Sequence, residues 1–130
     1  EAERQRMEAV AAGVIEVRSQ EDWSSTVGTK DGKMTVVFWG GTWCRKCVAL
    51  KPKFISLAAR LGEQGPNFLY GDAKKASTLG LESVQTVPAF QVYRDGRLLA
   101  DYVPGLNVNR VIPAVESLIA ECEVMELEED

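Results

Sequence analysis

The chain has 130 residues, of which 45% are hydrophobic and 26% are charged, and its formal net charge is −4 at pH 7. This length is enough for one domain with a conventional core, and the composition is that of a soluble globular protein. The acidic balance argues against nucleic acid as a partner, and no apolar run approaches the roughly 20 residues of a membrane span. We therefore expect a single domain with neither a nucleic-acid nor a membrane partner.

Residues 1–12 are strong helix formers with little apolar face, so they predict a solvated helical arm. Residues 14–17 are mainly apolar and β-branched and predict a first strand. Ser19 is a plausible N-cap, with Asp22 in the position of an acidic capping box, and predicts a helix that ends near Val27.

Residues 35–39, Thr-Val-Val-Phe-Trp, are apolar without alternation, which is typical of a central strand covered on both faces. A segment with helical spacing of apolar residues follows from Arg45 and ends at Gly62. Pro52 lies inside this helix. Because proline removes one backbone hydrogen bond, we expect a kink that separates the first turn from the buried remainder.

The second half predicts shorter elements: strands at 68–70, 90–93 and 98–103, a helix at 76–81 and a final helix capped by Asn107 or Asn109. Asp95-Gly96 is the turn between the last two strands. Asp72, Lys74 and Lys75 are expected in a solvated strand end and loop. The acidic tail, from residue 121 to 130, is expected to be partly disordered. The order of elements is that of an α/β fold with a mixed sheet.

Cys44 and Cys47 lie three residues apart at the start of the predicted helix, so their thiols can form and reopen a small disulfide ring. A helix N-terminus favours the thiolate, which is the form that attacks disulfides. Arg45 and Lys46 add two positive charges between the thiols. Since they stabilise the reduced, thiolate form, they predict a more oxidising couple.

Two other interpretations of this cysteine pair are weaker. Tetrahedral zinc needs four ligands, and the chain offers only one further cysteine, Cys122, and no histidine, so we expect no metal. A permanent disulfide across three residues would close too small a loop to constrain the unfolded chain much. A redox-active pair is therefore favoured.

The unit of strand, Trp43-Cys-x-x-Cys and helix, the proline at 52, the Val87-Pro88 step and Gly105 together resemble the thioredoxin family. The resemblance covers residues 13–122, between a helical arm at 1–12 and an acidic tail at 123–130. It implies the thioredoxin fold, a central mixed sheet of four to five strands flanked by helices. The run WCRKC followed by Lys-Pro-Lys resembles the thioredoxin-like 2 proteins of plant and algal plastids.

The resemblance also implies roles for single residues. Cys44 would be the attacking thiol and Cys47 the resolving thiol, with Trp43 packed beside them. Pro88 would follow a cis peptide bond, and its neighbour Val87 would contact a bound substrate chain in a groove that Gly105 also lines.

Two departures from the family pattern concern the chemistry. Thioredoxins carry a buried aspartate on the central strand behind the cysteines, whereas residues 37–39 here are Val-Phe-Trp. Deprotonation of Cys47 is then expected to depend on water or on Lys46 and its surroundings. The usual Gly-Pro between the cysteines is replaced by Arg45-Lys46.

The expected function is dithiol–disulfide exchange with cysteines of protein substrates, by a monomer without a cofactor. The resemblance implies an oxidant of redox-regulated enzymes in the plastid stroma that passes electrons to a 2-Cys peroxiredoxin. Because the sequence starts at Glu1 rather than methionine, we expect that a targeting peptide has been removed.

Three questions stay open at this point. A general disulfide reductase, fed by a thioredoxin reductase or a ferredoxin-linked system, would use the same cysteines in the other direction. A thioredoxin-like binding module would use only the groove. Cys122 is expected as a small apolar filler of the last helix, with a regulatory thiol as the alternative.

Overall fold

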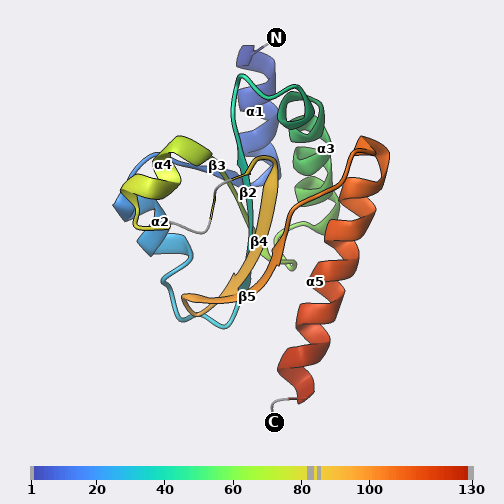
Figure 1. Cartoon of the computed structure of the whole chain (residues 1–130). Helices are drawn as coiled ribbons and strands as arrows, with labels where there is room; N and C mark the ends of the chain where they lie inside the picture. The colour runs from blue at the N-terminus through green and yellow to red at the C-terminus, as the bar shows by residue number, and fades with distance from the viewer. Residues whose placement is uncertain (1, 82–83, 85, 129–130) are drawn as a thin grey trace.

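A mixed sheet of five strands organises the computed structural model, which describes residues 2–81, 84 and 86–128 (Figure 1). The strand order is β1-β3-β2-β4-β5. The first three strands in this order run parallel, and β4 pairs antiparallel with both β2 and β5. The strands are β1 (Val14–Val17), β2 (Met34–Gly40), β3 (Asn67–Asp72), β4 (Ala89–Arg94) and β5 (Arg97–Tyr102). All five predicted strands are confirmed, with ends that differ by at most a few residues.

Helices cover both faces of the sheet (Figure 1). Three of them lie on one face: α1 (Ala2–Ala12), α3 (Arg45–Leu61) and α5 (Val111–Glu128). The two shorter helices, α2 (Gln20–Thr26) and α4 (Ala73–Thr78), lie on the other. This is the predicted α/β architecture. Within the described residues no helix is long and apolar enough to cross a membrane.

The central strand β2 is buried along its whole length, because its side chains alternate between two hydrophobic clusters. Val36 and Phe38 point into the larger cluster, which β2 shares with α3 and α5. Val37 and Trp39 point into the smaller cluster beside α2 and α4. The apolar, β-branched composition of residues 35–39 is thus explained by packing on both faces.

The predicted N-cap of α2, Ser19, is confirmed, but the Asp22 carboxylate accepts from a backbone N–H one residue before the one that a capping box uses. The Asp22 backbone N–H donates to Ser19 Oγ at 3.2 Å. Asp22 Oδ2 in turn accepts from the backbone N–H of Arg18 at 2.8 Å, one residue earlier than a capping box requires. The two bonds together satisfy backbone donors at the start of the helix.

The prediction for residues 72–81 was partly wrong. Asp72 ends β3 and is also the N-cap of α4, because its Oδ1 accepts from the Lys74 backbone N–H at 2.8 Å. Lys74 and Lys75 therefore belong to the helix and not to a loop. The helix also ends early, at Thr78, shortly before Gly80 takes a positive φ of 78° that a helix cannot continue through.

The predicted disorder of the acidic tail was also wrong as far as residue 128. Asn107 caps a short 3₁₀ turn, Val108–Arg110, by accepting from the Asn109 N–H at 3.0 Å, and α5 then runs without a break to Glu128. Glutamate, methionine and leucine are good helix formers, and Cys122 anchors this part of the helix in the core. Residues 129–130 lie outside the described residues.

Two predicted local features are present. Asp95 and Gly96, with φ of 51° and 80°, form the tight turn between β4 and β5. The predicted arm is helical from Ala2 to Ala12 and has no fully buried residue over this range, but Ala9 and Ala12 pack against the larger core cluster. The arm is thus attached to the domain on the α3 side.

Candidate active site

Cys44 and Cys47 lie where the chain leaves β2 and begins α3. Cys44 is the N-cap of α3, and its Sγ accepts from the Cys47 backbone N–H at 3.3 Å. The Cys44 backbone N–H donates to the Gly41 carbonyl at 3.2 Å, which closes the turn before the helix. Both thiols are free. The pair therefore sits at a helix N-terminus, where the backbone amides and the helix dipole favour a thiolate.

Two glycines lie before the cysteines in this turn, and neighbouring side chains come close to the position that a Cβ would take on each of them. A Cβ on Gly41 would lie 2.7 Å from the Trp43 ring, and one on Gly40 would lie 3.3 Å from Cys47 Sγ. The Trp43 ring consequently covers the backbone of Gly41, yet 61% of this residue remains exposed. Trp43 is thus available for contact with another molecule beside the cysteines.

Burial distinguishes the two thiols. Cys44 is partly exposed, whereas Cys47 is only 1% exposed. Burial first, and then the hydrogen bond to Cys44, raise the pKa of Cys47 from 9.0 to about 12. Cys47 is therefore a protonated thiol at neutral pH. Cys44 can therefore be reached by an external disulfide, whereas Cys47 is buried behind it and can be reached only from within the site.

The two cations between the cysteines occupy different environments. Arg45 opens α3 and is exposed. Lys46 is half-buried, and its Nζ donates to the Gly105 carbonyl oxygen at 3.2 Å. This bond joins the first turn of α3 to the loop after β5. The structure thereby brings together two residues, Lys46 and Gly105, that the sequence analysis assigned to separate roles.

The Val87-Pro88 step lies at the same end of the sheet as the cysteines. The peptide bond between them is cis. Trp39 in β2 pairs with Ala89 in β4, so Pro88 comes next to Gly40, the last residue of β2. Val87 is partly buried and packs against the core cluster that Cys44 also borders.

The other predicted positions lie in helices. Pro52 is inside α3, which is one continuous helix from Arg45 to Leu61, and the kink there stays a prediction. Cys122 is 1% exposed and packs in the larger core cluster from α5. This burial agrees with the expected apolar filler and leaves the thiol little access to a partner.

Tyr70 belongs to the site, although the sequence analysis treated it only as part of a buried strand. Its hydroxyl oxygen would lie 3.2 Å from a Cβ on Gly40, and Cys47 Cβ would lie at the same distance from that point. Burial first, and then the charge of Cys47, raise the pKa of Tyr70 to about 12. The signal that could have indicated this position is the hydroxyl group of Tyr70, which follows two apolar residues in β3 and lies two residues before the end of that strand.

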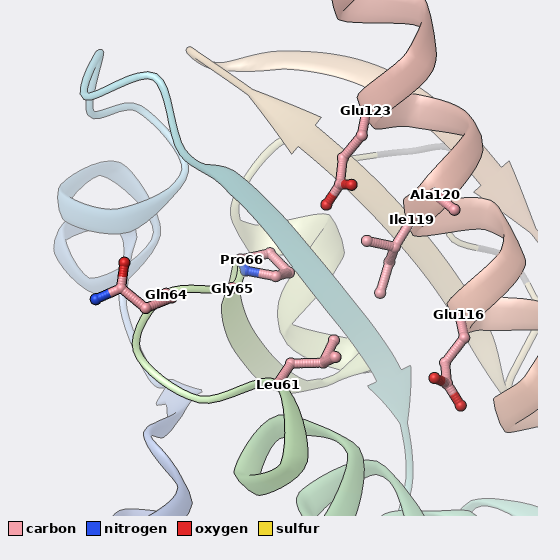
Figure 2. A pocket seen from close by; sticks show the side chains of 8 residues that line it. All are labelled: Leu61, Gln64, Gly65, Pro66, Glu116, Ile119, Ala120 and Glu123. Atoms are coloured by element: carbon pink, nitrogen blue, oxygen red, sulfur yellow. The ribbon is translucent and has the colours of Figure 1, made fainter.

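A separate hollow of about 290 Å³ lies at the opposite end of α3, between Leu61, residues 64–66 and α5. Figure 2 shows Glu116 and Glu123 of α5 facing this hollow, together with Ile119. It is lined by no cysteine, so it is not the redox site. Among the described residues, no three side chains of His, Cys, Asp or Glu form a metal-binding group.

Comparisons with known proteins agree with this geometry. The sequence model of the thioredoxin family matches residues 14–117. A thioredoxin of Coprinus comatus is 32% identical over 92 residues, which cover 70% of this chain and 82% of that protein. Thioredoxin-like 3-2, chloroplastic, of Arabidopsis thaliana is 30% identical over 113 residues, which are 85% of this chain but 58% of that longer protein.

Among solved structures, thioredoxin f from spinach chloroplast superimposes with a TM-score of 0.63 at 25% identity, covering 87% of this chain and 92% of that one. The fold, the paired thiols at the start of α3 and these relatives lead to one assignment. The chain belongs to the thioredoxin family and is a protein disulfide oxidoreductase of that family.

Proposed function

We propose that this protein exchanges a Cys44–Cys47 disulfide with dithiols of protein partners and is poised to act mainly as an oxidant. The observation that carries the direction is the pair of cations, Arg45 and Lys46, in the first turn of α3 between the two thiols. Positive charge stabilises a thiolate, and a stabilised reduced form makes the disulfide a stronger oxidant.

In the oxidising direction, a thiolate of the reduced partner attacks Cys44 Sγ. The Cys44–Cys47 bond breaks, and Cys47 leaves with the electron pair and takes up a proton, as its high pKa favours. A second thiolate of the partner then attacks the partner's own sulfur in the mixed disulfide. The partner keeps a new disulfide, and Cys44 leaves as a thiolate, so two electrons have moved to this protein.

The partner is proposed to bind across the surface between Trp43, Val87 and Gly105. Trp43 is exposed beside Cys44, and Leu106, next to Gly105, is 88% exposed. The Lys46–Gly105 hydrogen bond holds the loop after β5 against α3. An extended segment of a partner could therefore contact the backbone before Pro88 while its cysteine reaches Cys44.

We further propose that the protein works in the plastid as a monomer, oxidises redox-regulated enzymes there and passes their electrons to a 2-Cys peroxiredoxin. Support for the compartment comes from the chloroplastic thioredoxin-like relative. The peroxiredoxin is a suitable acceptor because its disulfide can take both electrons from the dithiol, which restores the Cys44–Cys47 bond.

A general disulfide reductase is the second candidate, since relatives of this chain are named thioredoxin. It would need a thioredoxin reductase or a ferredoxin-linked donor to return the disulfide to the dithiol. Insulin reduction with each donor system would detect it. A binding module, by contrast, would keep its function after Cys44→Ser, whereas both redox functions would lose it.

The midpoint potential of the Cys44–Cys47 couple tests the oxidising direction. We expect a value tens of millivolts above the roughly −270 mV of thioredoxin, measured by equilibration with dithiol buffers and thiol labelling. The variant Arg45→Gln/Lys46→Gln should lower the potential by about 10–30 mV, because both cations stabilise the thiolate. A matched control, Lys30→Gln/Lys53→Gln, removes two exposed cations elsewhere and should leave the potential unchanged.

A potential equal to that of thioredoxin would favour the reductase instead. An equal shift in the control variant would show that the net charge of the protein, and not the position of Arg45 and Lys46, sets the potential.

A further inference from the structure

The resolving thiol poses a chemical problem. Cys47 must become a thiolate to attack, yet burial is the main cause of its high pKa. The polar groups that shift this pKa are the Cys44 thiol and the backbone amides of Gly41 and Cys47 itself, and none of these groups is a carboxylate. In a mixed disulfide Cys44 carries no charge, so burial remains as the main obstacle to resolution.

Tyr70 is placed to reduce this obstacle. Its hydroxyl oxygen and Cys47 Sγ lie 3.2 Å and 3.3 Å from the same point, the position of a Cβ on Gly40. The two groups therefore face one gap that only a glycine at residue 40 leaves open. Packing holds the Tyr70 ring in place, since it meets Phe38 edge-on at 5.2 Å between ring centroids.

Tyr70 also borders a hollow at the surface of the protein. Its side chain, which is 9% exposed, lines a hollow of about 580 Å³ between α1, the end of β1 and α3. Lys51 Nζ lies 4.2 Å from the ring centroid, and Glu16 is the residue opposite Tyr70 in the β1–β3 pairing. The charged groups around Tyr70 are Glu16, Asp72 and Lys51, with Arg6 and Arg18 across the hollow. Tyr70 thus lies between the buried Cys47 thiol and a hollow at the surface that is lined by charged side chains.

The phenol has the right properties for this place. With a pKa raised to about 12, it keeps its proton throughout the neutral range and can donate a hydrogen bond at any physiological pH. A hydrogen bond to the charged form of a group favours that form. An O–H donor facing a new thiolate therefore offsets part of the cost of its burial.

We propose that the Tyr70 hydroxyl donates a hydrogen bond to the Cys47 thiolate during resolution of a mixed disulfide, and that the thiol proton leaves to solvent through the hollow that Tyr70 lines. This inference rests on the proposed roles of Cys44 and Cys47. In the step, Cys47 loses its proton, and its sulfur attacks Cys44 Sγ. The Cys44–Cys47 bond forms and the bond to the partner sulfur breaks. The partner leaves as a thiolate with the electron pair, which protonates in solvent.

The step can be followed with 5,5′-dithiobis(2-nitrobenzoate) in stopped flow. One equivalent of reagent reacts first with Cys44, which releases one thionitrobenzoate, and then with Cys47, which releases the second and leaves the disulfide. Tyr70→Phe removes only the hydroxyl. We expect the second release to slow by about tenfold or more at pH 7, with its pH midpoint moved upward, and the first release to stay unchanged.

Tyr93→Phe is the matched control, because Tyr93 is also buried but its hydroxyl donates to Gln91 Oε1 in the other cluster. It should change neither release. Gly40→Ala is a second variant that keeps the hydroxyl and fills the gap with a methyl group, and it should also slow only the second release. If Tyr70→Phe does not fold, an unchanged second release in Gly40→Ala overturns the inference, because the methyl group would then fill the gap between the two groups without effect.

An unchanged rate and pH midpoint of the second release in a folded Tyr70→Phe protein would overturn the inference. So would an equal slowing of both releases, because a general disturbance of the site would then be the cause. Failure of the proposed function looks different: the unmodified protein would release only one thionitrobenzoate, or none.

Discussion

At the scale of single residues, solvent exposure distinguishes the two cysteines of the site. Cys44 caps a helix at the surface, and Cys47 lies one turn behind it at 1% exposure. The Cys47 backbone N–H donates to Cys44 Sγ, so the protein directs a backbone dipole at the sulfur that an external disulfide can reach. Gly40 and Gly41 leave room for this arrangement, because a Cβ on Gly40 would press on Cys47 and a Cβ on Gly41 would force the Trp43 ring to move.

A short pulse of iodoacetamide on the reduced protein at pH 8 should modify Cys44 and leave Cys47 and Cys122 unmodified. Only thiolates react, and Cys47 has a pKa of about 12, while Cys122 is buried in the core. Peptide mass spectrometry gives the extent at each site, and the same pulse in denaturant should modify all three. Equal modification of Cys44 and Cys47 in the folded protein would contradict the division of roles.

At the scale of elements, capping side chains decided where helices begin and packing decided how far they extend. Asp72 starts α4 three residues before the predicted helix because its carboxylate accepts from the Lys74 N–H. The last helix continues through an acidic segment, and one of its inner positions, Cys122, lies against the core. The acidic composition of this segment predicted disorder there, because composition does not show that one residue, Cys122, is buried against the core.

Substitution of Cys122 tests whether this thiol is structural. Cys122→Ser should lower the free energy of unfolding by about 1–3 kcal/mol, because a buried hydroxyl replaces a weakly polar thiol. Cys122→Ala, which adds no polar group, should cost less. Both variants should run on a non-reducing gel like the unmodified protein. A disulfide-linked dimer that disappears in Cys122→Ser would instead identify a regulatory thiol.

At the scale of the whole molecule, two hydrophobic clusters hold the sheet from opposite faces, and titratable groups are buried in both. Tyr70 and Cys47 belong to the larger cluster and Tyr93 to the smaller one. Burial is the first cause of the raised pKa in all three, each to about 12. The folded state thus retains protons that the unfolded chain would release in alkali.

The stability of the reduced protein should therefore fall at high pH. These three groups have little effect below about pH 8, where both states are protonated. As the pH rises through the ordinary pKa values of 9.0 for cysteine and 10.0 for tyrosine towards about 12, the unfolded chain loses protons that the folded protein keeps. We expect the free energy of unfolding in urea to fall by about 1 kcal/mol or more between pH 8 and pH 10.

Tyr93→Phe provides the control for this prediction. It removes one titrating group, so the decline should become shallower, most clearly above pH 10, while the part that Cys47 contributes from about pH 9 stays. A free energy of unfolding that does not change up to pH 10.5 would show that the folded protein ionises as readily as the unfolded chain.

Local patterns in the sequence are enough to predict several elements. The apolar run at 35–39, the Asp95-Gly96 turn and the spacing of Cys44 and Cys47 predict the central strand, the hairpin and the redox pair, because each depends on neighbours along the chain. The resemblance to thioredoxins then implied a central mixed sheet of four to five strands and the groove.

The tertiary structure alone decided the surroundings of the resolving thiol. The approach of Tyr70 to Cys47 depends on the pairing of β3 with β2, and the Lys46–Gly105 bond joins residues 59 positions apart. Neither arrangement leaves a local pattern, since strand pairing and loop placement bring distant residues together only when the whole sheet has formed. Residue type and spacing thus identify the thiols that we propose to react, and packing places Tyr70 near Cys47.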